Sequence, residues 1–329
     1  MVSEERLQEL KRVAAKLLSA NALTEEELSE KMNINRTLTK RIMFSLRDEG
    51  FYLEEVNGKF ILRLDKINFH ELGAKLKTRV IGRRMMFYKE VGSTMDIARA
   101  MHGHEGLVVL AERQRNGRGR RGREWVSPGG GLWFSVVLRP YNPPQYTSLI
   151  PLFSALATAE AIENITDLTP SLKWPNDIQI NGRKVCGVLT EAIYELGEIS
   201  SVIIGIGVNN NIPHEVFPEN IRNEATSLME ETGYPIPPLV LLSSILERLE
   251  EYYKLFIRKN YEKILSIWKK KTLMLGSDAV IGINGESIIG KVIDVDNQGR
   301  LVFINTKGDH MVLNAGQIDY IRIIKGTGQ

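Results

Sequence analysis

The part of the sequence with the most potential chemistry is a basic, glycine-rich segment at residues 114–125. Between Arg115 and Arg123 it contains five arginines and three glycines. Arginine stays charged and holds carboxylate or phosphate oxygens with a planar fork, and glycine lets the backbone come close to a ligand. The pattern predicts a loop that closes over a polyanion. Repulsion among the like charges predicts that this loop is mobile until an anion neutralises them.

A solvated basic loop or a nucleic-acid patch would have the same composition. The flanking residues favour a site, because an apolar segment at 107–111 leads directly into the loop. Trp125, Leu132 and Trp133 lead out of it toward another apolar segment. We therefore expect the loop to be tied at both ends to core strands.

A second candidate motif is Lys-Trp-Pro-Asn-Asp at residues 173–177, followed by Lys184 at the start of an apolar segment. Lysine and asparagine beside a rigid Trp-Pro turn can bind phosphate, and an aspartate oxygen suits the hard cation Mg²⁺. A turn without function and an edge-strand lysine are the alternative interpretations.

Two familiar nucleotide-binding signatures fail. The glycines at 205–207 lack the third glycine of a dinucleotide fingerprint, because Asn210 stands in its place. Residues 285–291 nearly match a Walker A loop, but Val292 replaces the required Ser or Thr, and the segment belongs to an all-β region. Any nucleotide must therefore be bound by a motif other than a dinucleotide fingerprint or a Walker A loop.

Length and composition limit the number of domains and the class of protein. The chain has 329 residues, 43% hydrophobic content and a formal net charge of +3, which allows two or three domains with an ordinary surface. Its single cysteine, Cys186, excludes an internal disulfide and a multi-cysteine metal site. The N-terminus is polar, and no apolar run reaches the ~18 residues of a membrane span. We expect a cytoplasmic protein with no membrane partner.

The elements that must position these residues begin with a small helical region. Periodic leucines and alanines predict a helix at 4–18, and Thr24 with Glu27 is a capping box that opens a second helix. A third helix is expected at 36–48.

A hairpin follows, because Asn57-Gly58 separates two apolar runs. Helix, helix, turn, helix and hairpin is the order of a winged helix-turn-helix domain, which we place at residues 1–65. A helical connector is expected at 65–77.

The central region, residues 66–274, mixes strands, hairpins and long helices. Apolar runs predict strands at 86–90, 107–112, 132–139, 185–194 and 199–208, and helical spacing predicts helices at 95–101, 147–165 and 237–256. A second Asn-Gly, at residues 181–182, predicts an antiparallel pair of strands at 178–180 and 184–189. This mixture favours an α+β fold over a doubly wound sheet. Residues 275–329 carry closely spaced turns between β-branched runs and predict a small barrel.

Together these motifs resemble those of the biotin–protein ligase family. The resemblance rests on Gln-x-x-Gly-Arg-Gly-Arg-x-Gly-Arg-x-Trp from residue 114, Lys-Trp-Pro-Asn-Asp from residue 173, Lys-x-x-Gly from residue 184 and Gly-x-Gly-x-Asn from residue 205. It covers residues 80 to about 325 and implies a catalytic domain like those of class II synthetases, with an SH3-like C-terminal barrel. The additional N-terminal domain resembles that of bifunctional members, which also repress the biotin operon.

The resemblance implies a two-step reaction. The biotin carboxylate attacks the α-phosphate of ATP to give biotinyl-5′-AMP and pyrophosphate. A lysine amine of a biotin carboxyl-carrier protein, such as the carrier subunit of acetyl-CoA carboxylase, then attacks the mixed anhydride. Because an anion attacks an anion, cations must lie between them, and Mg²⁺ neutralises more of the charge. Arg118 and Lys184 match the catalytic residues of the family.

The resemblance also implies binding roles. Biotin contacts are expected from Ser93, Thr94, Met95, Gln114, Gly117, Arg118, Gly119, Arg120, Lys184 and Gly187. ATP contacts are expected from Arg118, Arg121, Arg123, Trp125, Lys173, Asn176 and Asn209, with Trp125 stacking on the adenine. Asp177 is the expected Mg²⁺ ligand. A helix N-cap is the alternative interpretation of Ser93-Thr94, and the two roles are compatible.

The N-terminal domain is expected to bind operator DNA of biotin genes. The contacts would come from the third helix and the wing, through Arg36, Thr37, Lys40, Arg41, Arg47 and Lys59. Residues 1–63 hold eleven basic and eleven acidic side chains, so we expect one copy to bind weakly and a dimer to bind two half-sites. A winged helix that binds protein is the alternative.

Two other functions fit parts of the pattern: a DNA-binding sensor of biotin or biotinyl-AMP without ligase activity, and a lipoate ligase. The intact arginine loop and Lys184 argue against the sensor, and the repeated Gly-Arg favours biotin over lipoate. We also expect biotinyl-AMP to order residues 117–125 and to promote a homodimer.

Overall fold

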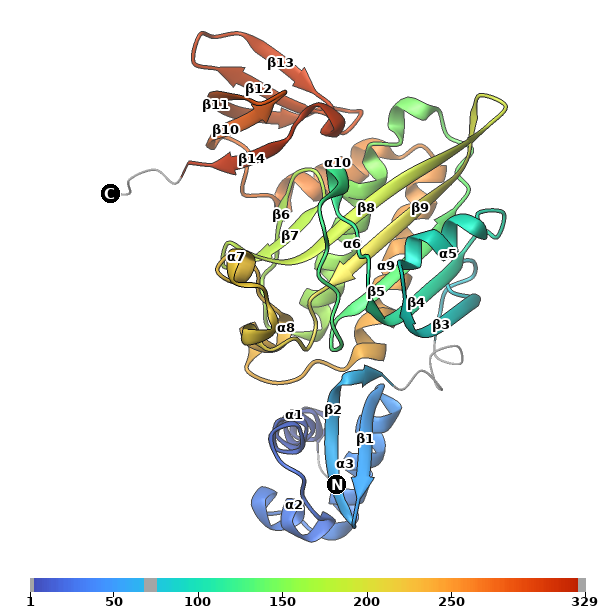
Figure 1. Ribbon diagram of the computed structural model, residues 1–329, viewed down its shortest axis with the longest axis vertical. Coiled ribbons are helices and arrows are strands. Elements are labelled where there is room, and N and C mark those ends of the chain that lie inside the picture. Colours follow the sequence, from blue (N-terminus) through green and yellow to red (C-terminus); the bar gives the residue numbers. More distant parts are fainter. Residues whose placement is uncertain (1–2, 68–75, 325–329) are drawn as a thin grey trace.

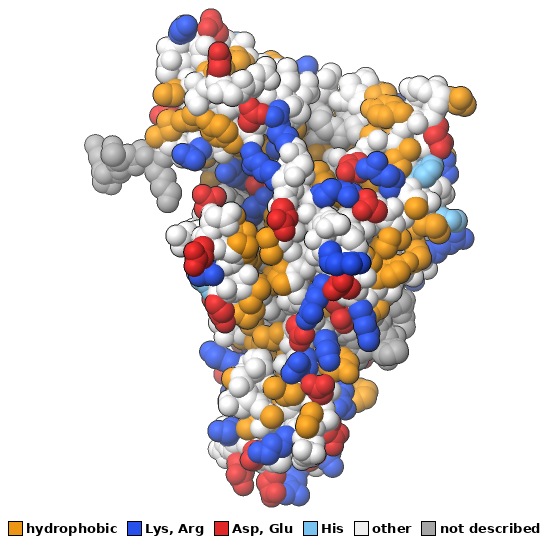
Figure 2. Space-filling view, in the orientation of Figure 1, with side chains coloured by type: hydrophobic (Ala, Val, Ile, Leu, Met, Phe, Trp, Pro, Cys, Tyr) orange, Lys and Arg blue, Asp and Glu red, His pale blue; other side chains and the backbone are white. Residues whose placement is uncertain are grey.

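The computed structural model describes residues 3–67 and 76–324. Figure 1 shows three parts in chain order: a small N-terminal domain, a central domain around a large sheet, and a C-terminal sheet at the end opposite the N-terminal domain. Charged side chains are spread over all three (Figure 2). The predicted mixture of helices and sheets is confirmed. No helix within these two ranges has the length and apolar character needed to cross a bilayer.

The N-terminal domain contains three helices and a two-stranded antiparallel sheet, as the sequence predicts. Its elements are α1 Glu4–Ala20, α2 Glu25–Met32, α3 Arg36–Asp48, β1 Phe51–Val56 and β2 Lys59–Ile67. Thr24 and Glu27 form the expected capping box, and Asn57 and Gly58 both have positive φ in the tight turn of the hairpin. Apolar residues from all three helices and the hairpin form a core of their own.

The central domain is built on a seven-stranded mixed sheet. Its strands are β3 Arg84–Val91, β4 Leu107–Gln114, β5 Leu132–Leu138, β6 Ser171–Lys173, β7 Asp177–Ile180, β8 Arg183–Glu195 and β9 Glu198–Val208. Their order is β3-β4-β5-β9-β8-β7-β6. The β3–β4 pair is parallel and the other five pairs are antiparallel. Every predicted strand exists, and β6 is the one that was missed, since three residues are too few to show a period.

Helices cover the sheet and line its edges. They are α5 Thr94–Ala100, α6 Leu149–Ile165, α7 Glu219–Arg222, α8 Leu228–Thr232, α9 Pro238–Ile257 and α10 Tyr261–Lys271, with 3-10 turns at Arg120–Gly122, Pro144–Tyr146, His214–Val216 and Ala315–Gln317. The three predicted helices are α5, α6 and α9. Helix α6 is apolar on nearly every side because it is buried between the sheet and α9.

The C-terminal part is a five-stranded antiparallel sheet, as the all-β prediction requires. Its strands are β10 Asp278–Ile283, β11 Glu286–Val295, β12 Leu301–Asn305, β13 His310–Leu313 and β14 Tyr320–Ile323, in the order β13-β12-β11-β10-β14. Unlike the N-terminal domain, it shares one hydrophobic core with the central domain. The indole N–H of Trp174 donates to the carbonyl of Gly299 at 3.0 Å and joins the two.

The predicted helical connector at 65–77 is wrong at both ends that the structure describes. Residues 65–67 continue β2, because Ile67 pairs with Phe51 and is buried. Residues 68–75 lie outside the described part of the chain. Leu76 and Lys77 are not helical, since the N–H of Lys77 donates to the Glu247 carboxylate on α9 at 3.1 Å rather than to a carbonyl of its own segment.

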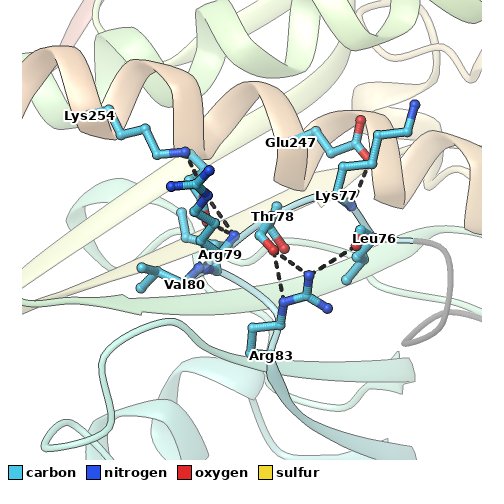
Figure 3. A network of polar contacts seen from close by, with 10 residues as sticks. Leu76, Lys77, Thr78, Arg79, Val80, Arg83, Glu247 and Lys254 are labelled. Carbon is cyan, nitrogen blue, oxygen red and sulfur yellow. Dashed lines mark hydrogen bonds and ion pairs between the residues drawn. The ribbon is translucent and has the colours of Figure 1, made fainter.

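The buried carboxylate of Glu250 fixes the segment at residues 76–83, with which the described part of the central domain begins. Figure 3 shows residues 76–83 running alongside α9. Glu250 on α9 accepts the N–H groups of residues 79–81 at 2.8–3.0 Å and the Lys254 ammonium at 2.6 Å. Burial alone would raise the pKa of Glu250, but the hydrogen bonds from Lys254 and the backbone outweigh it and lower that pKa to about 2.

We expect Glu250→Gln to lower the free energy of unfolding near neutral pH by about 3 kcal/mol, which corresponds to the shift from an ordinary glutamate pKa of about 4.3 to about 2. Since the folded-state pKa is lowered, this stability is present above about pH 4.3 and is lost as the pH falls toward 2. Urea unfolding near pH 7 and near pH 3 measures it. The difference between wild type and variant should shrink at the lower pH.

The control is Glu251→Gln, because that carboxylate lies on the exposed side of the same helix. Equal losses in the two variants, or a Glu250→Gln loss that does not depend on pH, would contradict the role of the buried carboxylate.

Candidate active site

The arginine loop and the central strands enclose a cavity of about 570 Å³. The first turn of α5, strands β8 and β9, and residues 318–322 complete its walls. Figure 2 shows Lys and Arg side chains gathered where the C-terminal sheet, at the top, meets the central domain. Positive charge is in excess, with six cationic side chains and four carboxylates along the walls: Arg118, Arg120, Arg123, Lys173, Lys184 and Arg322, and Glu124, Asp177, Glu224 and Asp319.

Glycines form the floor. Gly187 on β8 pairs with Gly207 on β9, and the Trp125 indole lies on both of them. A Cβ on Gly207 would lie 2.4 Å from Trp125 Nε1, and one on Gly205 would lie 2.7 Å from the Met95 sulfur. The indole N–H of Trp125 is buried and donates to no described residue. The floor is thus apolar, and the Trp125 ring lies directly against it.

Ser93 and Thr94 sit at one end of this floor. Ser93 caps α5, accepting the Met95 N–H at 3.3 Å, which confirms the N-cap interpretation, and both residues also line the cavity. The Thr94 N–H donates to Gln114 Oε1 at 2.8 Å, and Gln114 Nε2 donates to Ser127 Oγ at 3.0 Å. Gln114 therefore ties the start of α5 to both ends of the arginine loop.

The loop itself is a hairpin. Trp125 donates its N–H to the carbonyl of Gly117 at 2.9 Å, and Gly119 donates to Arg123 at 2.7 Å. At the tip, Arg121 has φ 58°, a left-handed conformation that non-glycine residues adopt at a cost. Arg118 lies before this tip, and Arg120, Arg121 and Arg123 lie at the tip or after it.

Three of the arginines contact the turn at residues 315–319, just before β14. Arg120 and Arg123 donate to backbone carbonyls of this turn, and Arg121 pairs with the Asp319 carboxylate. Burial lowers the pKa of the Arg120 guanidinium. The sequence gives no sign of these partners, since Arg120 and its acceptor are 195 residues apart.

Arg118 points instead toward α5. Its guanidinium makes two contacts with the Asp96 carboxylate, at 2.5 and 3.1 Å, and this hydrogen-bonded anion raises the pKa of Arg118. Arg118 therefore lies on the α5 side of the cavity, apart from the three arginines at the C-terminal turn.

Lys184 and Asp177 form an ion pair at the sheet side. Their Nζ–Oδ1 distance is 2.6 Å, and the same ammonium lies 4.9 Å from the centroid of the Trp125 ring. Burial lowers the pKa of nearby Lys173, while Asp177 opposes that shift. Within residues 3–67 and 76–324 no cluster of three or more His, Cys, Asp or Glu could hold a metal ion. A cation at Asp177 would therefore need further ligands from a bound molecule.

Asn176 and Asn209 support the walls and also line the cavity. Asn176 exchanges hydrogen bonds with Val188 of β8, at 2.5 Å from its side-chain amide and 2.9 Å to its carbonyl. The Asn209 amide donates to the Thr226 carbonyl at 3.0 Å. One N–H of each buried amide is thus used within the protein, and the remaining polar atoms can serve a ligand.

Most residues that the sequence marked for biotin, ATP or Mg²⁺ line this one cavity. Two do not: Gly117, whose backbone packs against Trp125 and Ser127, and Arg121, which contacts Asp319. The structure brings together Ser93, Thr94, Met95, Gln114, Arg118, Gly119, Arg120, Arg123, Trp125, Lys173, Asn176, Asp177, Lys184, Gly187 and Asn209. None of the residues expected to bind DNA lies on the cavity; they are on α3 and β2.

Two walls were not predicted. One is formed by residues after β9, including Phe217 and Ala225, which Lys184 brings to β8 through backbone hydrogen bonds with Glu224 and Thr226. The other is residues 318–322. The glycines at 205 and 207 do not point to these walls, because the groups that lie close to them are Met95 and Trp125.

An apolar floor with cations around it suits a ligand that combines a ring or aliphatic part with several negative charges. It also suits reactions in which negative charge must be brought together.

Comparisons with known proteins agree with this chemistry. Residues 91–209 match the biotin/lipoate A/B protein ligase family. The bifunctional ligase/repressor BirA of Bacillus subtilis is 32% identical over 297 residues, 88% of this chain and 91% of BirA. The biotin–[acetyl-CoA-carboxylase] ligase of Mycobacterium tuberculosis is 30% identical over 75% of this chain and 94% of its own.

Among solved structures, the biotin protein ligase from Aquifex aeolicus in complex with biotin and ATP has a TM-score of 0.66 and 32% identity, and covers 74% of this chain and 100% of that one. With such identity to the Bacillus subtilis relative along most of both chains, the protein is a ligase enzyme and belongs to the biotin protein ligase family.

Proposed function

We propose that the protein activates biotin with ATP and transfers it to a lysine of a biotin carboxyl-carrier protein. The observation that carries this proposal is that five cationic side chains converge on one cavity with a glycine floor: Arg118, Arg120, Arg123, Lys173 and Lys184. The Aquifex aeolicus relative was solved with biotin and ATP. The Mycobacterium tuberculosis relative is named for acetyl-CoA carboxylase, which supports the carrier subunit of that enzyme as the acceptor.

In the first step a carboxylate oxygen of biotin attacks the α-phosphorus, forming biotinyl-AMP and releasing pyrophosphate. Both reactants are negative, so fixed cations lower the barrier. Lys184 supplies one charge and Arg118 the other. In the described structure Arg118 is paired with the Asp96 carboxylate. When a ligand binds, its carboxylate or phosphate can take the place of Asp96, so the guanidinium has an anionic partner both before and after binding. In the second step the carrier amine attacks the acyl carbon and AMP leaves.

Trp125 offers its ring to the adenine, and Arg123, Lys173, Asn176 and Asn209 surround the phosphates. Arg121 acts on the nucleotide only through the loop that it holds to Asp319. Magnesium in proteins commonly takes one or two carboxylates and completes its shell with substrate phosphates and water. A single carboxylate at Asp177 fits that pattern. The ion, when bound, neutralises phosphate charge.

We propose three domains: a winged helix-turn-helix at residues 1–65, the catalytic domain at 66–274 with a class II synthetase-like sheet, and an SH3-like barrel at 275–329. The separate core of the first supports that boundary. The boundary at residue 274 separates two sheets but not two hydrophobic cores, because the barrel and the catalytic domain share one core.

We propose that the N-terminal domain binds operator DNA of biotin genes and that a ligand-promoted homodimer represses them. The name ligase/repressor of the Bacillus subtilis relative supports this role. Arg36, Lys40 and Lys59 each pair with a glutamate of α2. Such largely exposed pairs are weak, so phosphates can replace the glutamates. Thr37, Arg41 and Arg47 complete the expected contact set.

The decisive experiment is transfer of labelled biotin from ATP, Mg²⁺ and purified protein to a biotin carboxyl-carrier domain. Lys184→Ala and Arg118→Gly should each reduce the rate on the order of 10²-fold, because each removes a charge that stabilises the transition state. Lys263→Ala on the exposed face of α10 is the control. Tight biotin binding without any transfer by the wild type would refute the ligase proposal and favour a sensor.

Gly207→Ala tests the floor. The added methyl group would overlap the Trp125 indole, so the ring must move and ATP affinity should fall roughly tenfold, about 1.4 kcal/mol. Equilibrium binding of ATP, together with a change in tryptophan fluorescence, measures both effects. Gly103→Ala adds the same methyl group in open space, and a similar loss there would show that the effect is not specific to the floor.

The lowered pKa of Lys173 predicts a pH dependence for biotinyl-AMP formation. Because burial lowers this pKa, the ammonium loses its charge at a lower pH than an ordinary lysine does. As the pH rises, kcat/KM should therefore begin to fall before the usual lysine pKa of about 10.4 is reached. Lys173→Arg keeps the charge to higher pH and should move the alkaline limb upward. An unchanged limb would mean that another group controls it. Lys263→Arg is the matched control.

A further inference from the structure

Among the described residues of the N-terminal domain, the most exposed large apolar side chain is Phe44 on α3. It is 72% exposed, compared with 53% for Val56 and 41% for Val13. One exposed apolar residue requires no explanation by itself. The position of Phe44 among the other side chains of α3 is what gives it meaning.

Helix α3 has one face in the core and one in solvent. Its buried residues are Thr39, Ile42, Met43 and Leu46. The exposed residues include Thr37, Lys40, Arg41 and Phe44. The last three follow Thr37 by three, four and seven positions, so all four lie on one face of the helix. A recognition helix lying along a major groove presents its base-contacting side chains with the same spacing.

Cations flank the ring along the helix. Lys40 and Arg41 lie one turn before Phe44, and Arg47 lies nearly one turn after it. A protein partner would have to remove these charges from water to bury a single ring. A bilayer surface would gain only one apolar side chain. DNA offers phosphates to the cations and, on thymine, an apolar 5-methyl group in the major groove.

We propose that Phe44 reads thymine by packing its ring against the 5-methyl group of a base in the major groove. The inference rests on the proposed DNA-binding function of the N-terminal domain and adds a source of sequence preference to it. Lys40 and Arg41 position the helix through phosphates, while Phe44 favours a methylated pyrimidine over an unmethylated one at one position of each half-site.

The test removes that methyl group alone. Duplexes that bind the full-length protein in the presence of biotin, ATP and Mg²⁺ are selected from a random-sequence library, and each thymine of a selected site is replaced singly by uracil. At one position in each half-site, uracil should weaken binding roughly fourfold, as expected for one methyl group that is no longer buried. In Phe44→Ala, the same replacement should have no effect, whereas Val13→Ala should behave as the wild type.

Uracil tolerated at every position by the wild type, or an equal uracil penalty in wild type and Phe44→Ala, would overturn the assignment while leaving DNA binding intact. Failure of the wild type to select any duplex would refute the DNA-binding proposal itself, and the role of Phe44 with it. Because Phe44 is exposed, the substitution should not unfold α3, and circular dichroism of the variant checks this.

Discussion

The mutual repulsion of cations around one cavity is the constraint on which the rest of the candidate active site depends. Like charges a few ångströms apart in a partly buried place do not stay together without partners. The fold supplies such partners: Asp96 on α5 holds Arg118, Asp177 on β7 holds Lys184, and the turn before β14 holds Arg120, Arg121 and Arg123. The carboxylates that line the cavity are fewer than the cations, so an excess of positive charge remains for a ligand with several negative charges to neutralise.

The C-terminal sheet for this reason helps to form the candidate active site and is not an appended domain. Its turn at residues 315–319 holds the arginine loop, and its own position is fixed at Gly299, whose carbonyl accepts the Trp174 indole N–H. A Cβ there would lie 3.0 Å from Leu149 of α6, and its φ is +79°, so only glycine allows this approach without strain. The motif at residues 173–177 therefore lines the cavity and also anchors the sheet that shapes the loop above it.

Features that depend on contacts between residues close together in the sequence could be predicted, and features that depend on contacts between distant residues could not. The capping box at Thr24 and the Asn-Gly turns are decided by neighbours a few residues apart, and the structure has them where the sequence indicated. The loop and the motif at residues 173–177 reached one cavity because each is tied to a core strand. The partners of Arg120, Arg121 and Arg123 could not be predicted, since they lie about two hundred residues away. The prediction of a helical connector failed for the same reason, because the carboxylate of Glu247 on the distant helix α9 accepts the N–H of Lys77.

The cavity also meets the N-terminal domain through a short series of close contacts. Asn209 lines the cavity, and the next two asparagines donate to the carbonyl of Ile236, at 3.2 and 2.9 Å. Three residues later, the Leu239 N–H donates to the Glu49 carbonyl at the end of α3. A Cβ on Gly50 would lie 2.3 Å from the Leu239 side chain, so the two segments touch at the backbone. Residues 236–239 therefore contact both the end of β9 beside the cavity and the end of α3, and direct packing through this one segment joins the catalytic sheet to the N-terminal domain.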